Sequence, residues 1–214
     1  MNLVDPKIIP HNIAIEACIQ SLEEALKSER NGVHQLEICS RLDLDGLTPD
    51  KQLVLDIISQ CNALPKIMIR PRGGKFVHND AEIKTMIEDI KWFQDHGIKQ
   101  IVLGVLSDQN EVDIPQLQLL SDAAQGMQIT FHKAIDLVPD PLKAIEQLRQ
   151  FNNVRYILSS GQAKTAWEGR TMLVEMIAAA GEDIDIVVAG KVRYENLTIL
   201  HEAISAKYYH GRGF

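Results

Sequence analysis

The sequence predicts a single α/β domain spanning residues 1–214, a closed TIM-like (β/α)8 barrel that lacks its final helix. Three observations favour this fold. Eight short apolar runs alternate with longer segments of helical period, no glycine-rich dinucleotide signature follows the first run, and polar residues occur within several runs. An open doubly wound sheet is the alternative, but a barrel accommodates polar side chains at the carboxyl ends of its strands.

The eight predicted strands are short and rich in β-branched residues. They cover residues 12–18, 35–39, 66–70, 100–106, 128–132, 154–158, 185–189 and 207–210. Because ten or more residues of helical pattern separate most neighbouring strands, parallel pairing is expected throughout.

The intervening helices have recognisable start signals. Side-chain oxygens that can cap their amino ends belong to Ser21, Thr48, Asn79, Asp113 and Asp140. The third helix has one apolar stripe that should face the sheet, and Gly97 is placed to end it. The stripe consists of Ile83, Met86, Ile87, Ile90 and Phe93.

Composition excludes several classes of protein. Hydrophobic residues make up 45% and charged residues 24%, as in ordinary globular proteins, and the net charge of −7 argues against nucleic-acid binding. No apolar stretch approaches the roughly 20 residues of a membrane span, and the first ten residues resemble no targeting signal. An odd count of three cysteines suits a reducing compartment, so a cytoplasmic location is expected.

Strand alternation indicates which side chains enter the barrel. In the first strand Glu16 and Cys18 share one face, and in the second strand Glu37 and Cys39 do the same. A carboxylate beneath the helix layer would be costly, so all four should point inward. Two soft thiols on neighbouring strands are the kind of ligands that favour Cu(I). The alternative is that both cysteines are small buried hydrophobes, which is the commoner fate of a free cysteine.

The third and fifth strands end in further polar residues. Arg70 is expected either to pair with Glu16 or Glu37 or to bind an anionic ligand together with Arg72. A salt-bridge network that only closes the barrel is the alternative.

His132 is followed by Asp136, and this pair suggests a base and the group that orients it. A histidine satisfied by its neighbours is the alternative. Two further turns, around Ser160 and Gly161 and around Gly190 and Lys191, follow the sixth and seventh strands, where barrels often bind phosphate.

Seven stretches that together span most of the chain resemble the CutC family. The most specific is the I-R-P-R-G-G segment at 69–74. The others lie at 15–18, 36–40, 46–49, 86–90, 131–136 and 160–163.

The resemblance implies a TIM-like barrel, a cytosolic role in copper homeostasis and a link to copper through Cys18 and Cys39. It also implies a cluster without an assigned reaction, formed by Glu16, Glu37, Arg70, His132 and Asp136. The sequence departs from the family where a glycine triplet is replaced by Ala189-Gly190-Lys191 and where a serine is replaced by Arg212.

Two functions are therefore open. One is Cu(I) binding by the paired cysteines. The other is an enzyme that acts on a small anionic substrate, phosphorylated or sugar-like, by acid and base chemistry.

The absent eighth helix has a structural consequence. It should leave apolar surface over the first and eighth strands, to be covered by the segment before Asn12 or by a second subunit. A homodimer or higher homo-oligomer is thus expected.

Overall fold

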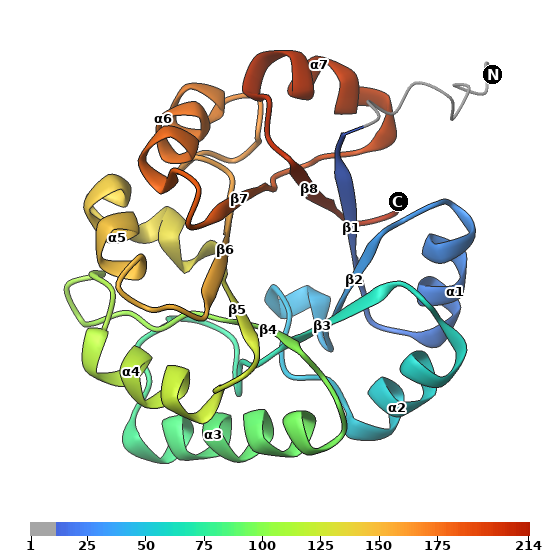
Figure 1. The fold of residues 1–214 in the computed structure, drawn as a ribbon, viewed down its shortest axis with the longest axis vertical. Helices are drawn as coiled ribbons and strands as arrows, with labels where there is room; N and C mark the ends of the chain where they lie inside the picture. The colour runs from blue at the N-terminus through green and yellow to red at the C-terminus, as the bar shows by residue number, and fades with distance from the viewer. Residues whose placement is uncertain (1–11) are drawn as a thin grey trace.

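In the computed structural model, which describes residues 12–214, eight parallel strands close into a barrel in chain order (Figure 1). The strands are β1 (Ala14–Ile19), β2 (Gln35–Ile38), β3 (Leu64–Met68), β4 (Gln100–Leu103), β5 (Gln128–Phe131), β6 (Val154–Ser159), β7 (Asp185–Val188) and β8 (Tyr208–Gly211). Each lies within a few residues of its predicted position. The predicted TIM-like barrel is confirmed.

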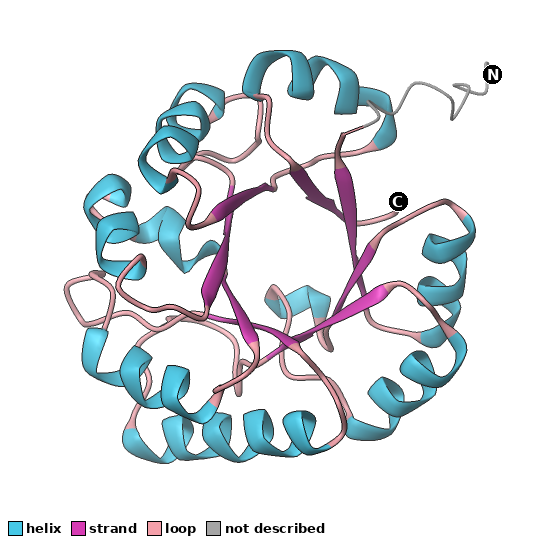
Figure 2. Ribbon diagram, in the orientation of Figure 1, coloured by secondary structure: helices cyan, strands magenta, loops and turns pink. Residues whose placement is uncertain are grey.

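The α-helices form a ring outside the strands (Figure 2). They are α1 (Leu22–Arg30), α2 (Lys51–Gln60), α3 (Asp80–Asp95), α4 (Ile114–Ala123), α5 (Pro141–Leu148), α6 (Arg170–Ala180) and α7 (Tyr194–Ile204). Two 3-10 turns, η2 (Leu42–Leu44) and η3 (Lys133–Leu137), follow β2 and β5. Within residues 12–214 no helix follows β8, as predicted, and none is long and apolar enough to cross a membrane.

Four predicted helix caps are confirmed and one is wrong. The side chains of Ser21, Asn79, Asp113 and Asp140 each accept a hydrogen bond from the first turn of the following helix. Thr48 does not cap α2, because its hydroxyl instead accepts the backbone N–H of Arg70 at 2.9 Å.

Asp50, two residues later, caps α2 by accepting from Gln52 N and Leu53 N. Thr48 therefore ties the start of α2 to the end of β3.

The apolar core lies between the barrel and the helices. Four residues of the predicted stripe on α3 are buried there, whereas Ile87 is partly exposed. Alternate residues of β1 face the same layer, and Ile15 and Ala17 are fully buried. Their inward neighbours, Glu16 and Cys18, consequently enter the barrel as the alternation predicts.

The seam between α7 and α1 is closed within the chain. The Phe214 ring packs edge to face on Tyr194, and its carbonyl accepts a hydrogen bond from Ser28 at 3.0 Å. Phe214 and Tyr209 are buried, and Phe214 packs against Gly211 of β8, so it supplies part of the cover that was expected from the segment before Asn12 or from a second subunit. The homo-oligomer stays a prediction without that support, and the segment before Asn12 lies outside the described residues.

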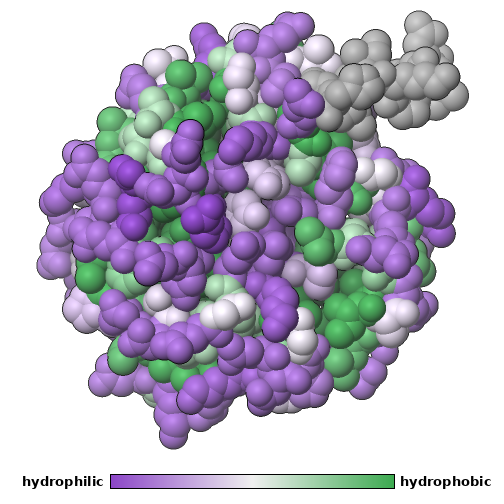
Figure 3. All heavy atoms as spheres, viewed as in Figure 1, coloured by the Kyte–Doolittle hydropathy of each residue, from purple (hydrophilic) through white to green (hydrophobic). Residues whose placement is uncertain are grey.

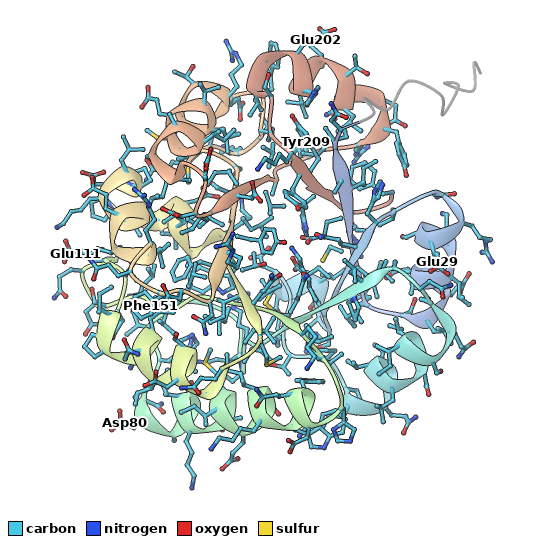
Figure 4. The ribbon with its side chains drawn as sticks, viewed as in Figure 1. Glu29, Asp80, Glu111, Phe151, Glu202 and Tyr209 are labelled. Carbon is cyan, nitrogen blue, oxygen red and sulfur yellow. The ribbon has the colours of Figure 1, made fainter. Side chains whose placement is uncertain are left out.

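Polar residues dominate the outer surface. In the face shown in Figure 3, hydrophobic residues form separate patches among hydrophilic ones. Figure 4 shows the labelled acidic residues Glu29, Asp80, Glu111 and Glu202 at the periphery of the molecule. Glu16 and Glu37 differ from them, because both are buried inside the barrel.

Candidate functional site

A cavity of about 650 Å³ lies among the carboxyl ends of the strands and the loops that follow them. Its walls include Cys18, Glu37, Arg70, His132, Asp136 and His210. Active sites of this fold are built at this end of the barrel, because the loops there vary freely above a rigid scaffold. We call this cavity the first pocket.

Two buried carboxyl groups and two cationic partners form a cluster, which we call the floor. Glu37 and His210 line the first pocket, whereas Glu16 and Lys66 are fully buried and do not line it. Glu16 lies between Lys66, whose Nζ is 2.7 Å from Oε2, and His210, whose Nδ1 is 2.8 Å from Oε1. The same histidine nitrogen is 3.5 Å from Glu37 Oε2. Register explains the arrangement, since Glu16 is aligned with His210 across the β1–β8 pair that closes the barrel.

The two carboxyl groups differ in protonation. Burial opposes ionisation of Glu16, but Lys66 and His210 lower its pKa to about 2. Burial raises the pKa of Glu37 to about 8, against the opposing charge of His210. At neutral pH the floor thus carries one carboxylate and one neutral carboxylic acid that can donate a proton.

The imidazolium between them is favoured. Burial lowers the pKa of His210, yet the surrounding Glu37, Cys18 and Glu16 raise it well above its ordinary value.

The two cysteines predicted to meet are brought together. Their sulfurs lie 3.6 Å apart, and Glu37 Oε1 is 3.3 Å from Cys39 Sγ and 3.8 Å from Cys18 Sγ. All three cysteines of the chain are free thiols. Cys18 is partly exposed to the first pocket, whereas Cys39 is buried behind it.

This dithiol is electronically asymmetric. The hydrogen bond from Cys39, helped by His210, lowers the pKa of Cys18 to about 5 against the effect of burial. The same hydrogen bond raises the pKa of Cys39 well above its ordinary value, and burial adds to this. Cys18 is therefore the reactive thiolate at neutral pH.

Arg70 does not pair with either buried glutamate. Its Nη1 donates to the carbonyls of Leu44, Asp45 and Gly46, and its Nη2 donates to Gly74. The Arg70 side chain extends from the end of β3 to the loop after β2. Lys66, four residues earlier on the same face of the strand, forms the ion pair with Glu16 that was expected of Arg70. Arg70 still lines the first pocket and packs over the Phe76 ring.

His132 and Asp136 both line the first pocket but do not form the expected pair. His132 Nδ1 accepts the backbone N–H of Ala134 at 3.2 Å, and Nε2 has no hydrogen-bond partner among the described residues. Burial and the nearby Arg70 lower the pKa of His132 to about 3, so its imidazole is neutral.

Asp136, in η3 after β5, is held by the end of β6 and the loop that follows it. Its carboxylate accepts from the hydroxyls of Ser159 and Ser160 and from the backbone N–H groups of Ser160 and Gln162. Burial opposes its ionisation, but the neighbouring Lys133 ammonium at 2.9 Å and these donors lower its pKa.

The other residues predicted to bind anions divide into two groups. The N–H groups at Ser160 and Gly161 are already used, the first by Asp136 and the second by Ser159 Oγ at 2.9 Å. Arg72 is held away from the first pocket by Glu82, 2.5 Å from its Nε. Gly190 and Lys191, by contrast, line a second, smaller cavity.

Sequence reasoning missed Lys66 and His210. Both belong to predicted strands, and Lys66 has the same alternation as Met68 and Arg70, which is a usable signal of an inward side chain. His210 carried no comparable signal, since its role depends on β8 closing against β1.

Comparison with known proteins agrees with this geometry. A family model described as the CutC family matches residues 13–213. The chain belongs to the CutC family. Among CutC relatives, a protein of Histophilus somni (strain 2336) is 38% identical over 182 residues, covering 85% of this chain and 74% of the relative. A human relative named "Copper homeostasis protein cutC homolog" is 34% identical over 197 residues, covering 92% and 71%.

Solved structures support the same assignment. A CutC crystal structure from Streptococcus agalactiae superposes with a TM-score of 0.88 at 30% identity, covering 93% of this chain and 98% of that one. A sialic acid aldolase from Ruminococcus gnavus reaches 0.68 at 12% identity, covering 94% and 68%. The second likeness concerns the barrel fold alone.

Proposed function

We propose that this CutC-family protein acts in copper homeostasis in the cytoplasm by binding Cu(I) between Cys18 and Cys39. The observation that carries the proposal is the 3.6 Å separation of two free sulfurs, of which Cys18 lines the first pocket and Cys39 lies buried behind it. Thiolates are the soft ligands that select Cu(I). The human relative's name supports the link to copper, and free thiols suit a reducing compartment.

The donor set fits a soft monovalent ion better than zinc. Cys18, Cys39 and Glu37 offer ligand atoms that lie within 4.8 Å of one another. A structural zinc site would need four nitrogen or sulfur ligands, whereas this set has two sulfurs and one carboxyl oxygen. Cys39 must lose its proton to bind, so affinity for Cu(I) should rise with pH.

An anaerobic competition titration against a chromophoric Cu(I) chelator tests this proposal. We expect one Cu(I) per chain in the parent and in Cys61→Ser, the matched control for the thiol outside the pocket. The Cys18→Ser/Cys39→Ser double variant should lose this binding. A double variant that binds as tightly as the parent contradicts the proposal.

A second candidate function is an enzyme that acts on a small anionic substrate by acid and base chemistry. The specific observation is that a neutral carboxylic acid and an imidazole N–H unpartnered within residues 12–214 line one cavity. Glu37 is protonated below about pH 8 and can donate a proton and take it back. His132 Nδ1 accepts from Ala134, so the neutral ring carries its proton on Nε2, which would donate a hydrogen bond to the substrate. Arg70 would bind the anionic part of the substrate, and Glu16 would hold His210 in place.

Thermal-shift screening with a library of small phosphorylated and sugar acids tests this candidate, because ligands that bind the native state raise the apparent melting temperature. Compounds that stabilise the parent are then assayed for turnover with Glu37→Gln as the variant. We expect Glu37→Gln to retain binding and lose turnover. A library without a stabilising compound contradicts the candidate.

A further inference from the structure

A second cavity of about 310 Å³ lies beside the first pocket, at the loops after β7 and β8. Its walls are formed by residues 189–193 and 211–212, together with Lys133 and His210. Lys133, His210 and Arg212 line both cavities. The two cavities are therefore adjacent and share three cationic or ionisable side chains.

The second cavity is strongly cationic. Lys133, Lys191, Arg193 and Arg212 line it, and no aspartate or glutamate does. Lys133 is already paired with Asp136, but Lys191, Arg193 and Arg212 form no ion pair with any residue of the described chain. Three uncompensated positive charges around one concavity are notable in a chain of net charge −7, because they create a local site for an anion.

Backbone donors point to the same ligand. In the loop after β6, the N–H groups of Ser160 and Gln162 are used by the Asp136 carboxylate. In the loop after β7, the N–H groups of Gly190, Lys191 and Val192 donate to no acceptor within residues 12–214. The amino end of α7 follows directly, and the first turn of a helix favours negative charge.

Gly190 is required for this shape. Its φ is +103°, and a Cβ there would lie 2.9 Å from Ala166 N and from Ser160 Cβ. The absence of a side chain lets the loop after β7 lie against the loop after β6, where the Gly190 carbonyl accepts from Ala166 N at 2.9 Å.

We propose that the second cavity binds the phosphate group, or a similar dianion, of a small molecule whose remaining part occupies the first pocket. Lys191 and Arg212 supply charge, and the N–H groups of Gly190, Lys191 and Val192 supply directional hydrogen bonds. The proposal deepens the second candidate function by naming the substrate as a phosphorylated small molecule. It is independent of Cu(I) binding.

Direct binding of inorganic phosphate and of glycerol 3-phosphate, with glycerol as the neutral comparison, tests the proposal by isothermal titration calorimetry. The test variant is Lys191→Gln/Arg212→Gln. The matched control is Lys99→Gln/Arg155→Gln, whose exposed side chains lie at the amino ends of β4 and β6, the opposite end of the same barrel.

The parent and the control should bind both phosphates saturably and should not bind glycerol. The test variant should lose about tenfold or more in affinity, because each lost charged donor removes a charge-assisted hydrogen bond. Equal affinity in the test variant and the parent, or no saturable binding by the parent, overturns the proposal.

The Glu37→Gln variant distinguishes phosphate binding in the second cavity from the enzymatic reaction proposed as the second candidate function. That variant leaves Lys191 and Arg212, the two cations assigned to the phosphate, unchanged, so phosphate binding should match the parent whether or not turnover exists. If the parent binds phosphate but turns over no substrate, the second candidate function is contradicted and the phosphate subsite is not. Loss of phosphate binding in Glu37→Gln overturns the second cavity as an independent subsite.

Discussion

Two carboxyl groups at the same end of the barrel, Glu37 and Asp136, are held in opposite ways. Asp136 accepts backbone and hydroxyl donors from the loop after β6, so its pKa is lowered. Glu37 is surrounded by thiols, another carboxylate and one shared histidine, so burial raises its pKa to about 8. Backbone donors make a carboxylate structural, whereas competition among side chains keeps a proton available for chemistry.

The same contrast applies to two lysine–carboxylate pairs. Lys66 and Glu16 are completely buried at 2.7 Å, whereas Lys133, paired with Asp136, has a side chain that is 45% exposed. The buried carboxylate near β1, β3 and β8 is therefore stabilised by buried cationic side chains. The carboxylate near β5 and β6 is stabilised by backbone donors and by a lysine that is open to solvent.

The largest expected effect comes from breaking the balance on the β1–β3–β8 side. Lys66→Met should lower the free energy of unfolding by about 3–5 kcal/mol, because it leaves Glu16 buried beside a single shared cation. Lys133→Met, the matched change on the other side, should cost about 1 kcal/mol or less. Urea denaturation measures both. Equal losses would contradict the contrast, and adding Glu16→Gln to Lys66→Met should recover part of the loss.

A smaller effect is expected from Asp136→Asn. Loss of the charge that accepts from Ser160 and Gln162 should cost about 1.5–3 kcal/mol. Hydrogen exchange at these two amides should become faster, while exchange in β1 and β2 stays unchanged. Unchanged exchange at Ser160 would show that the carboxylate does not order this loop.

The smallest effect at acid pH is expected from Glu37→Gln, because glutamine replaces a neutral carboxylic acid of similar shape. The cost below about pH 5 should be under about 1 kcal/mol. Since the pKa of Glu37 rises from 4.5 to about 8 on folding, its contribution to stability is present below 4.5 and is lost as pH rises through 8. The variant should accordingly become more stable relative to the parent as pH rises.

Asp136→Asn should show the opposite dependence. The pKa of Asp136 is lowered from 3.8, so its contribution is present above that value and is lost as pH falls further. Urea unfolding of both variants between pH 3 and pH 9 distinguishes the two dependences. Parallel curves would show that the two carboxyl groups are not held differently.

Much of the fold was predictable, because strand alternation and cap residues are local properties. Alternation alone placed Glu16 and Cys18 inside the barrel beside Glu37 and Cys39. It could not assign partners, since Arg70 reaches sideways to loop carbonyls while Lys66 reaches Glu16. Partner choice depends on strand register and side-chain reach, which one strand's sequence does not contain.

The contacts made by barrel closure could not be predicted from the sequence either. His210 meets Glu16 only because β8 pairs with β1, and the two residues are separated by 194 positions in the chain. The contribution of Phe214 to this seam was missed, because its contacts with Ser28 and Tyr194 join segments far apart in the chain.

Cys18 is held as a thiolate by its hydrogen bond from Cys39 and by His210, and the pH dependence of iodoacetamide alkylation tests this most directly. Peptide mass spectrometry resolves Cys18 from Cys61, whose pKa is raised by burial. The Cys18 rate should be half-maximal near pH 5 in the parent, and Cys39→Ala should move this midpoint upward. A midpoint at or above the ordinary value of 9.0 in the parent would contradict the account.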